Sequence, residues 1–72
     1  MKAKYTYTQI TARIPVDTKY SDELVAADLR QAYPTLTGDV VVIRENRTDQ
    51  RVELTASDGT TRAYTAAGLG PH

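Results

Sequence analysis

The stretch KAKYTYTQITARI, residues 2–14, decides how the rest of the chain is interpreted, because its apolar pattern changes phase partway along. Threonine and tyrosine are enriched and glycine is absent, which is typical of a β-strand, so we predict a strand over residues 4–14. Its tyrosines occupy odd positions and its later apolar residues even ones: Tyr5 and Tyr7, then Ile10, Ala12 and Ile14. Successive side chains of a strand point to opposite faces, so the two groups are expected on opposite faces of a sheet.

A helix is expected after this first strand. Pro15 ends the strand, because proline cannot donate a hydrogen bond to a sheet ladder, and residues 15–20 form a loop. Ser21 can cap a free backbone N–H group and two acidic residues follow it, a pattern typical of a helix N-terminus. Pro34 ends the helix, since the residue before a proline avoids the α region. The apolar face of the helix holds Val25, Leu29, Ala32 and Tyr33.

Three strands are predicted in the second half of the chain. The run VVVI, residues 40–43, is apolar and β-branched throughout, which favours a central strand, and residues 34–39 before it form a loop. Asp58-Gly59 is a strong hairpin signal. The two remaining strands fall at residues 51–56 and 61–66, after a turn at residues 46–49.

The order of these elements, β-α-β-β-β, predicts an α+β fold. We expect a small two-layer sandwich in which one helix packs on a mostly antiparallel four-stranded sheet. The chain has 72 residues and forms one domain at most, which we assign to residues 1–66, with a flexible C-terminal tail at residues 67–72. A core this small is only marginally sufficient, which gives the chain a reason to pair with a second copy of itself.

The turns give a trial register for the sheet. A two-residue turn at Asp58-Gly59 pairs Leu54 with Ala63, and a tight turn at residues 46–49 pairs Arg44 with Arg51. The residues that face the helix are then Ile10, Ala12, Ile14, Val41, Ile43, Val52, Leu54 and Ala63. The opposite face is rich in arginine and tyrosine, and the phase change in the first strand then needs no bulge. From this face we take the candidate partner-binding residues Tyr5, Tyr7, Arg13, Arg44, Arg51, Arg62 and Tyr64.

Arg44 opposite Arg51 is the most specific feature of this register. Like charges directly across a pair of strands are destabilising. Either neighbouring acids neutralise the pair, or the two arginines bind an anion, such as a phosphate or a carboxylate of a partner. The acids in question are Glu45, Asp49 and Glu53.

Catalytic and cofactor chemistry has little support in the sequence. There is no cysteine, which excludes disulfides and thiolate metal sites, and the one histidine, His72, is the last residue. Ser21 and Ser57 therefore have no histidine to act as a general base. We predict that the protein is not an enzyme and that it uses no cofactor, metal or small-molecule substrate.

The sequence also predicts a cytoplasmic protein without a membrane partner. No run of about 18 apolar residues exists, as a transmembrane helix would need. Thr6, Thr8 and Thr11 interrupt the apolar region that a signal peptide would need behind Lys2 and Lys4. The absence of cysteine agrees with a reducing compartment.

Three hypotheses remain open for the Tyr/Arg face: an ordinary solvated sheet face, a protein-contact surface, or a nucleic-acid interface. The formal net charge of zero and the central Glu53 weigh against nucleic acid. We therefore predict a small non-enzymatic interaction protein, a regulator or inhibitor of the phage or plasmid type, that binds a partner protein or a second copy of itself. The alternative is a DNA- or RNA-binding protein, or a transcriptional regulator, that uses the same basic and aromatic face.

Overall fold

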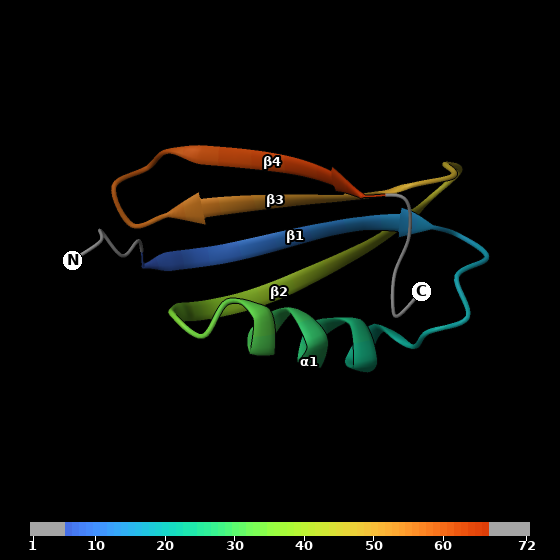
Figure 1. Cartoon of the computed structure of the whole chain (residues 1–72), viewed down its shortest axis with the longest axis horizontal. Helices are drawn as coiled ribbons and strands as arrows, with labels where there is room; N and C mark the ends of the chain where they lie inside the picture. The colour runs from blue at the N-terminus through green and yellow to red at the C-terminus, as the bar shows by residue number, and fades with distance from the viewer. Residues whose placement is uncertain (1–5, 67–72) are drawn as a thin grey trace.

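The computed structural model describes residues 6–66, and side chains to residue 65 (Figure 1). Tyr5 and the predicted tail, residues 67–72, lie outside the described residues. The elements follow one another as β1 (Tyr7–Pro15), α1 (Asp22–Ala32), β2 (Leu36–Glu45), β3 (Gln50–Ala56) and β4 (Thr61–Ala66). The predicted α+β fold is confirmed: one helix packs on a four-stranded, mostly antiparallel sheet.

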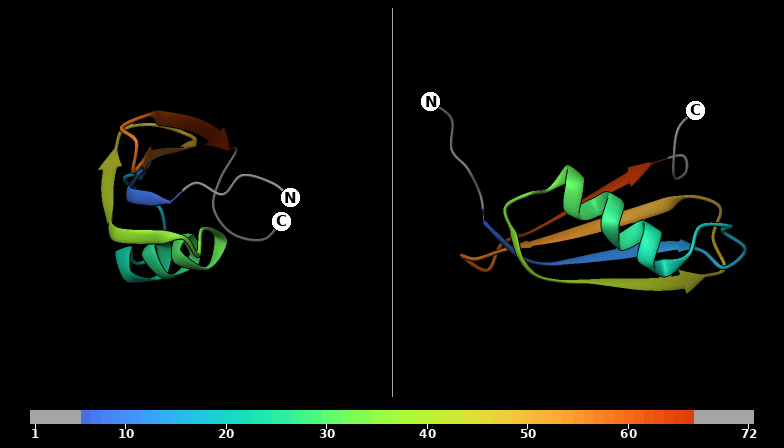
Figure 2. Two further views of the ribbon diagram at one scale, coloured as in Figure 1. Left: turned by 90° about the vertical axis from the view of Figure 1, so that its left-hand side faces the viewer. Right: turned by 90° about the horizontal axis from the view of Figure 1, so that it is seen from below.

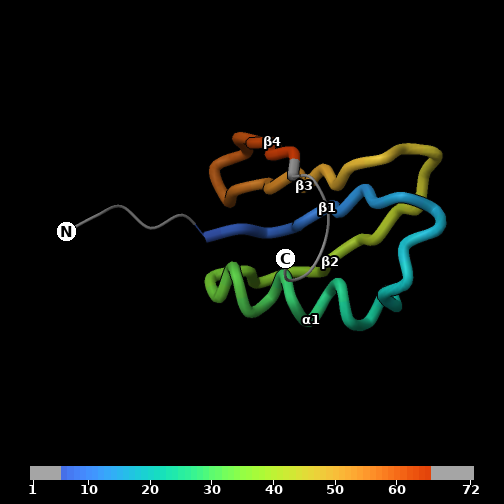
Figure 3. Tube along the Cα trace, turned by 45° about the vertical axis from the view of Figure 1, so that its right-hand side comes forward, coloured from blue at the N-terminus to red at the C-terminus, as the bar shows by residue number. Residues whose placement is uncertain are grey.

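The strands lie in the order β2-β1-β3-β4, with β1 parallel to β2 and all other neighbours antiparallel (Figure 1). The tube view shows β1 running between β2 and β3, while α1 lies alongside β2 (Figure 3). The prediction that residues 40–43 form a central strand is therefore wrong, because β2 is an edge strand. It also begins at Leu36, within the predicted loop. The predicted pairing of β2 with β3 is wrong for the same reason, since β1 separates them.

The phase change in β1 is a β-bulge at Thr8. Tyr7 lies opposite Ala56 of β3 and Gln9 lies opposite Thr55, so Thr8 is an extra residue in the ladder. The bulge returns Tyr7 to the side of Ile10, where its ring meets the ring of Tyr33 edge-on, with 5.8 Å between centroids. The expectation that the tyrosines of this strand face away from the helix is wrong for Tyr7.

Gly38 of β2 makes room for this bulge. A Cβ atom at Gly38 would lie 3.0 Å from the carbonyl carbon of Thr8 and would overlap its oxygen. Thr37 fastens the same point, because its hydroxyl donates a hydrogen bond to the carbonyl oxygen of Tyr7 at 3.2 Å. The close approach of the two backbones therefore requires glycine at position 38.

The helix begins and ends close to where the sequence predicts. Ser21 is the N-cap, and its hydroxyl accepts a hydrogen bond from the backbone N–H of Leu24 at 3.1 Å. The helix ends at Ala32, two residues before Pro34. Val25 and Leu29, one turn apart, are its buried residues, whereas Ala32 of the predicted apolar face is exposed. The helix crosses one face of the sheet and leaves the other uncovered (Figure 2).

The core lies between α1 and the two central strands. Val25 and Leu29 meet the β1 and β3 side chains that alternation had placed toward the helix. The buried apolar cluster is made of Ile10, Ala12, Ile14, Val25, Leu29, Val52 and Leu54. These side chains are at most 8% exposed, so the domain rests on this one cluster.

The hairpin between β3 and β4 has a three-residue loop, not the predicted two-residue turn. The N–H of Ala56 donates to the carbonyl oxygen of Thr60 at 2.8 Å, and Gly59 has a φ of +93°. This combination is typical of a type I turn followed by a left-handed glycine. The register shifts by one residue, so Leu54 pairs with Arg62 instead of Ala63. Such a shift moves every side chain of β4 to the other face.

Candidate functional site

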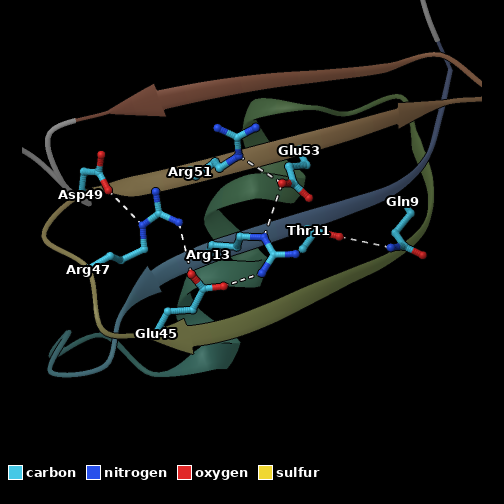
Figure 4. Close-up of polar contacts among 8 residues, drawn as sticks. All are labelled: Gln9, Thr11, Arg13, Glu45, Arg47, Asp49, Arg51 and Glu53. Atoms are coloured by element: carbon cyan, nitrogen blue, oxygen red, sulfur yellow. Dashed lines mark hydrogen bonds and ion pairs between the residues drawn. The ribbon is translucent and has the colours of Figure 1, made fainter.

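The sheet has a helix side and a side that the helix leaves uncovered, which we call the open face. On β1, β2 and β3 the alternate residues that point away from α1 form it. They are Gln9, Thr11, Arg13, Asp39, Val41, Ile43, Glu45, Arg51, Glu53 and Thr55. Figure 4 views the sheet from this side, with the helix behind the strands.

The predicted Tyr/Arg face is divided between the two sides. Of the predicted residues that the structure describes, only Arg13 and Arg51 lie on the open face, directly opposite each other on β1 and β3. The bulge places Tyr7 on the helix side, the shifted hairpin brings Tyr64 opposite Val52, and Arg62 lies opposite Leu54. Val41 and Ile43 go the other way and lie on the open face, as does Ala63, which pairs with Glu53. The predicted grouping on one surface is therefore wrong.

Arg44 supports the fold and does not pair with Arg51. It lies beside Ile14, on the helix side. Its Nε atom forms an ion pair with Oδ1 of Asp22 at 3.0 Å, and its Nη1 atom donates to the carbonyl oxygen of Thr18 at 2.9 Å. A further hydrogen bond reaches the carbonyl oxygen of Tyr20. Arg44 thus fastens the loop before the helix to the edge strand.

A chain of ion pairs covers the open face near the β2–β3 turn (Figure 4). Arg13 contacts Glu45 on one side and Glu53 on the other, with Arg13 Nε to Glu53 Oε2 at 3.4 Å. Arg51 also reaches Glu53, with Nε to Oε2 at 3.1 Å. The other end continues from Glu45 through Arg47 to Asp49, at 3.3 and 2.9 Å. The order is Asp49, Arg47, Glu45, Arg13, Glu53, Arg51, so arginine and carboxylate alternate throughout.

This alternation solves the problem of like charges across a strand pair. Arg13 and Arg51 are directly opposite, and the Glu53 carboxylate lies against both. The hydrogen bond from Arg51 is the main reason that the pKa of Glu53 is held below its usual range, and Arg13 adds to the effect. The pKa of Arg13 is raised, first by its hydrogen bond to Glu45. Two of the acids that the sequence suggested for the Arg44/Arg51 pair, Glu45 and Glu53, therefore neutralise the Arg13/Arg51 pair, while Asp49 contacts Arg47.

The lowered pKa of Glu53 predicts that acid weakens the domain through this residue. A carboxylate whose pKa is lower in the folded than in the unfolded chain stabilises the fold above its ordinary value of 4.5. This contribution is lost as the pH falls through the folded pKa. We expect the free energy of unfolding of Glu53→Gln to decrease less between pH about 6 and about 3 than that of the wild type. Urea titrations at both pH values measure it, and an equal decrease in both proteins would contradict the role given to Glu53.

Val41 and Ile43 form an apolar strip on the open face beside these charges. They lie on edge strand β2, next to Thr11 and Arg13 of β1. Val41 is 39% exposed, and Ile43 is half-buried. Val40 and Val42, which alternate with them in sequence, point to the helix side and pack against the core. The strand is therefore apolar on both faces although the helix covers only one.

Three tyrosines, Tyr7, Tyr33 and Tyr64, lie on the helix side of the sheet. Tyr7 and Tyr33 contact each other and the core, and Tyr64 on β4 is 48% exposed. Burial raises the pKa of Tyr33, and the nearby Tyr64 adds to the effect. Tyr7 and Tyr33 therefore complete the core, while Tyr64 remains available at the edge of the sheet.

The apolar strip and Arg47 were not predicted from the sequence as parts of this surface. The unbroken run at residues 40–43 was itself the signal, because a strand with apolar side chains on both faces requires cover on both. Arg51 and Glu53 are two positions apart on one strand, so they share a face and could have been paired from sequence alone.

The chain was compared with protein families, curated proteins and solved structures. No protein family, curated protein or solved structure matches this chain. Within residues 6–66, no group of three or more acidic, histidine or cysteine side chains is placed to hold a metal ion. The single helix among the described residues lacks the length and apolar character needed to span a membrane.

Proposed function

We propose that this chain is a small non-enzymatic interaction protein, a regulator or inhibitor, that binds a partner protein through the open face. The observation that carries the proposal is the apolar run of β2, which presents Val41 and Ile43 on a face that nothing in the described chain covers. Apolar residues on both sides of a strand are the pattern of strands buried on both faces. A partner would supply the missing cover.

The surroundings of the strip fit the same proposal. Protein interfaces combine an apolar centre with a polar rim. Here Arg13 and Glu45 border the strip and Glu53 lies one strand further away, and each is about one-third exposed or less. Arginine stems bury apolar surface while their charged groups remain hydrated. The partner best suited to this face is a protein with an apolar patch bordered by both signs of charge.

The alternative, nucleic-acid binding, has less support. Binding to nucleic acid draws its affinity from cations that replace the counterions of phosphates. Arg13, Arg47 and Arg51 on or beside the open face each contact a carboxylate of the same chain. A phosphate would have to displace these acids first.

The proposal is tested by comparing variants for retention of the same partner. Arg51→Glu and Val41→Thr alter two side chains that are about 40% exposed, so the domain should remain folded. Threonine keeps the β-branched shape of valine and removes its apolar surface. Lys19→Glu makes the same charge change as Arg51→Glu at an exposed loop residue away from the open face.

We expect immobilised wild-type protein and Lys19→Glu to retain a common partner from cells of the source, measured by quantitative mass spectrometry. Both open-face variants should lose it, with an affinity at least about tenfold weaker, as for residues that carry binding energy. Circular dichroism checks that each variant is folded. If the folded open-face variants retain the partner as well as Lys19→Glu does, the open face is not the contact surface.

The remaining parts of the proposal concern location and class. A reducing compartment agrees with a chain that has no cysteine, and we propose the cytoplasm. We also propose, from the length of the chain alone, that it belongs to the phage or plasmid type of small regulator or inhibitor.

A further inference from the structure

We propose that β4 is a dimerisation edge, at which a second copy of this chain adds its own β4 antiparallel to the first. Among the described elements β4 pairs with β3 alone. Residues 61–65 are all exposed. The strand contains no proline or bulge, devices that commonly prevent edge strands from pairing, and Arg62 is its one charged residue. This inference does not rest on the proposed function, because β4 contributes nothing to the apolar strip.

The register of the hairpin identifies the backbone groups that are free to pair. The N–H of Ala56 donates to the carbonyl oxygen of Thr60, so residues 56 and 60 form a hydrogen-bonded pair. In an antiparallel ladder such pairs alternate with pairs that do not exchange hydrogen bonds. Residues 62 and 64 therefore bond to β3 as Thr60 does. Thr61, Ala63 and Thr65 point their N–H and C=O groups toward the open edge.

These outward groups are arranged symmetrically about Ala63. If a two-fold axis passes beside Ala63, the residue pairs with its own copy, and Thr61 pairs with Thr65 of the second copy. All of these positions have outward donors and acceptors, so each pair exchanges two backbone hydrogen bonds. The small alanine side chain fits at the axis. This backbone pairing is open to any antiparallel strand, so the choice of a second copy depends on the side chains between these positions.

The side chains between these positions are complementary as well. The same pairing sets Arg62 opposite Tyr64 of the second copy, in a pair without hydrogen bonds, where side chains approach most closely. Both are exposed on the helix side of β4. A guanidinium over a tyrosine ring is attractive, and the symmetry forms the contact twice.

The other edge of the sheet is less suited to this role. Strand β2 lies beside α1, and Nη2 of Arg30 donates to the carbonyl oxygen of Gly38 at 3.1 Å. A helix side chain therefore already occupies a backbone acceptor of β2. The helix also leaves less room for another strand to reach this edge. The edge-to-edge contact at β4 is short, so we expect a dimer that dissociates on dilution.

Sedimentation velocity between about 10 μM and 1 mM chain tests the proposal. We expect the wild type to shift from monomer to dimer across this range. Ala63→Lys places two ammonium groups face to face at the axis and should remain monomeric at the highest concentration. Ala27→Lys adds the same charge at an exposed helix position and should dimerise like the wild type. A wild type that stays monomeric, or an Ala63→Lys protein that dimerises equally well, would overturn the proposal.

Amide hydrogen exchange gives a second readout. It uses the wild-type protein alone, so it does not depend on whether a variant folds correctly. Raising the concentration of wild-type protein should slow exchange at Thr61, Ala63 and Thr65, because their N–H groups become bonded in the dimer. The amides of Arg62 and Tyr64 bond to β3 in either state and should change little. A dimer that protects none of the first three amides would place the interface elsewhere and reject β4.

Discussion

Replacing Leu54 with aspartate is expected to unfold the domain. Leu54 is 1% exposed and belongs to the single buried cluster. Truncating a buried leucine costs about 2–5 kcal/mol, and a carboxylate without a partner adds a desolvation penalty. A chain of this length has a stability of about 4–11 kcal/mol at 0.05–0.15 kcal/mol per residue, and its small core favours the lower end. Far-ultraviolet circular dichroism and thermal unfolding measure the loss.

Val41→Asp is the matched control for Leu54→Asp. The register inferred from sequence put both residues on the helix side, whereas the structure places Val41 on the open face at 39% exposure. We therefore expect Val41→Asp to remain folded under conditions in which Leu54→Asp is not. If both variants unfold, the sequence-based register is right and the open face is misassigned. A folded Leu54→Asp protein would reverse the two sides of the sheet.

Gly38→Ala is expected to destabilise the domain more than any other single methyl added at an exposed or half-buried position. The new Cβ would overlap the carbonyl oxygen of Thr8, and a backbone atom cannot move aside as a flexible side chain can. Overpacking of this kind costs about 1–3 kcal/mol, and here it forces apart β1 and β2 at the bulge. Urea unfolding gives the change in the free energy of unfolding.

Gly59→Ala separates this steric effect from the general cost of replacing glycine. Gly59 has a φ of +93° but no atom within 4 Å of an added Cβ. Its replacement costs backbone strain alone, about 1–2 kcal/mol. Gly38→Ala should also remove the edge-on contact of Tyr7 with Tyr33, which nuclear Overhauser effects between the two rings report. An unchanged ring contact and a smaller loss than in Gly59→Ala would mean that β1 and β2 do not approach closely at Thr8.

Much of the fold could be predicted because local patterns determine it. Ser21 and Pro34 bracket the helix through capping and steric exclusion, which need no tertiary information. Strict alternation correctly placed Ile10 and Leu54 in the core. The class of fold followed from the order of these elements.

The surface was harder to predict because small local irregularities decide which side chains share a face. The bulge at Thr8 moves Tyr7, and one extra loop residue before Thr60 moves Arg62 and Tyr64. The bulge does appear in the sequence, as the phase change between Tyr7 and Ile10, but tyrosines on the opposite face explain that change equally well. The extra loop residue leaves no trace in the apolar pattern. The turn at residues 46–49 resembles a hairpin, yet it spans two strand spacings, about 10 Å, across the end of β1. Turn length alone does not tell whether the flanking strands are neighbours.

Carboxylates of the chain itself contact the arginines of the open face, and on this ground we propose that the partner is a protein and not a nucleic acid. Glu45→Gln combined with Glu53→Gln removes the acids that contact Arg13 and Arg51, while Arg47 keeps its ion pair with Asp49. This double variant serves as the positive control, because the guanidinium groups of Arg13 and Arg51 are then available to phosphates.

The most direct measurement is fluorescence anisotropy of labelled single-stranded DNA, duplex DNA and RNA, titrated with protein at about 20 mM and about 150 mM salt. We predict that the wild type shows no saturable binding to any of them at either salt concentration. The double variant should bind at low salt and lose that affinity at the higher concentration, as an interaction with phosphates requires. Micromolar binding by the wild type that disappears at the higher salt concentration would contradict the account and assign the open face to nucleic acid.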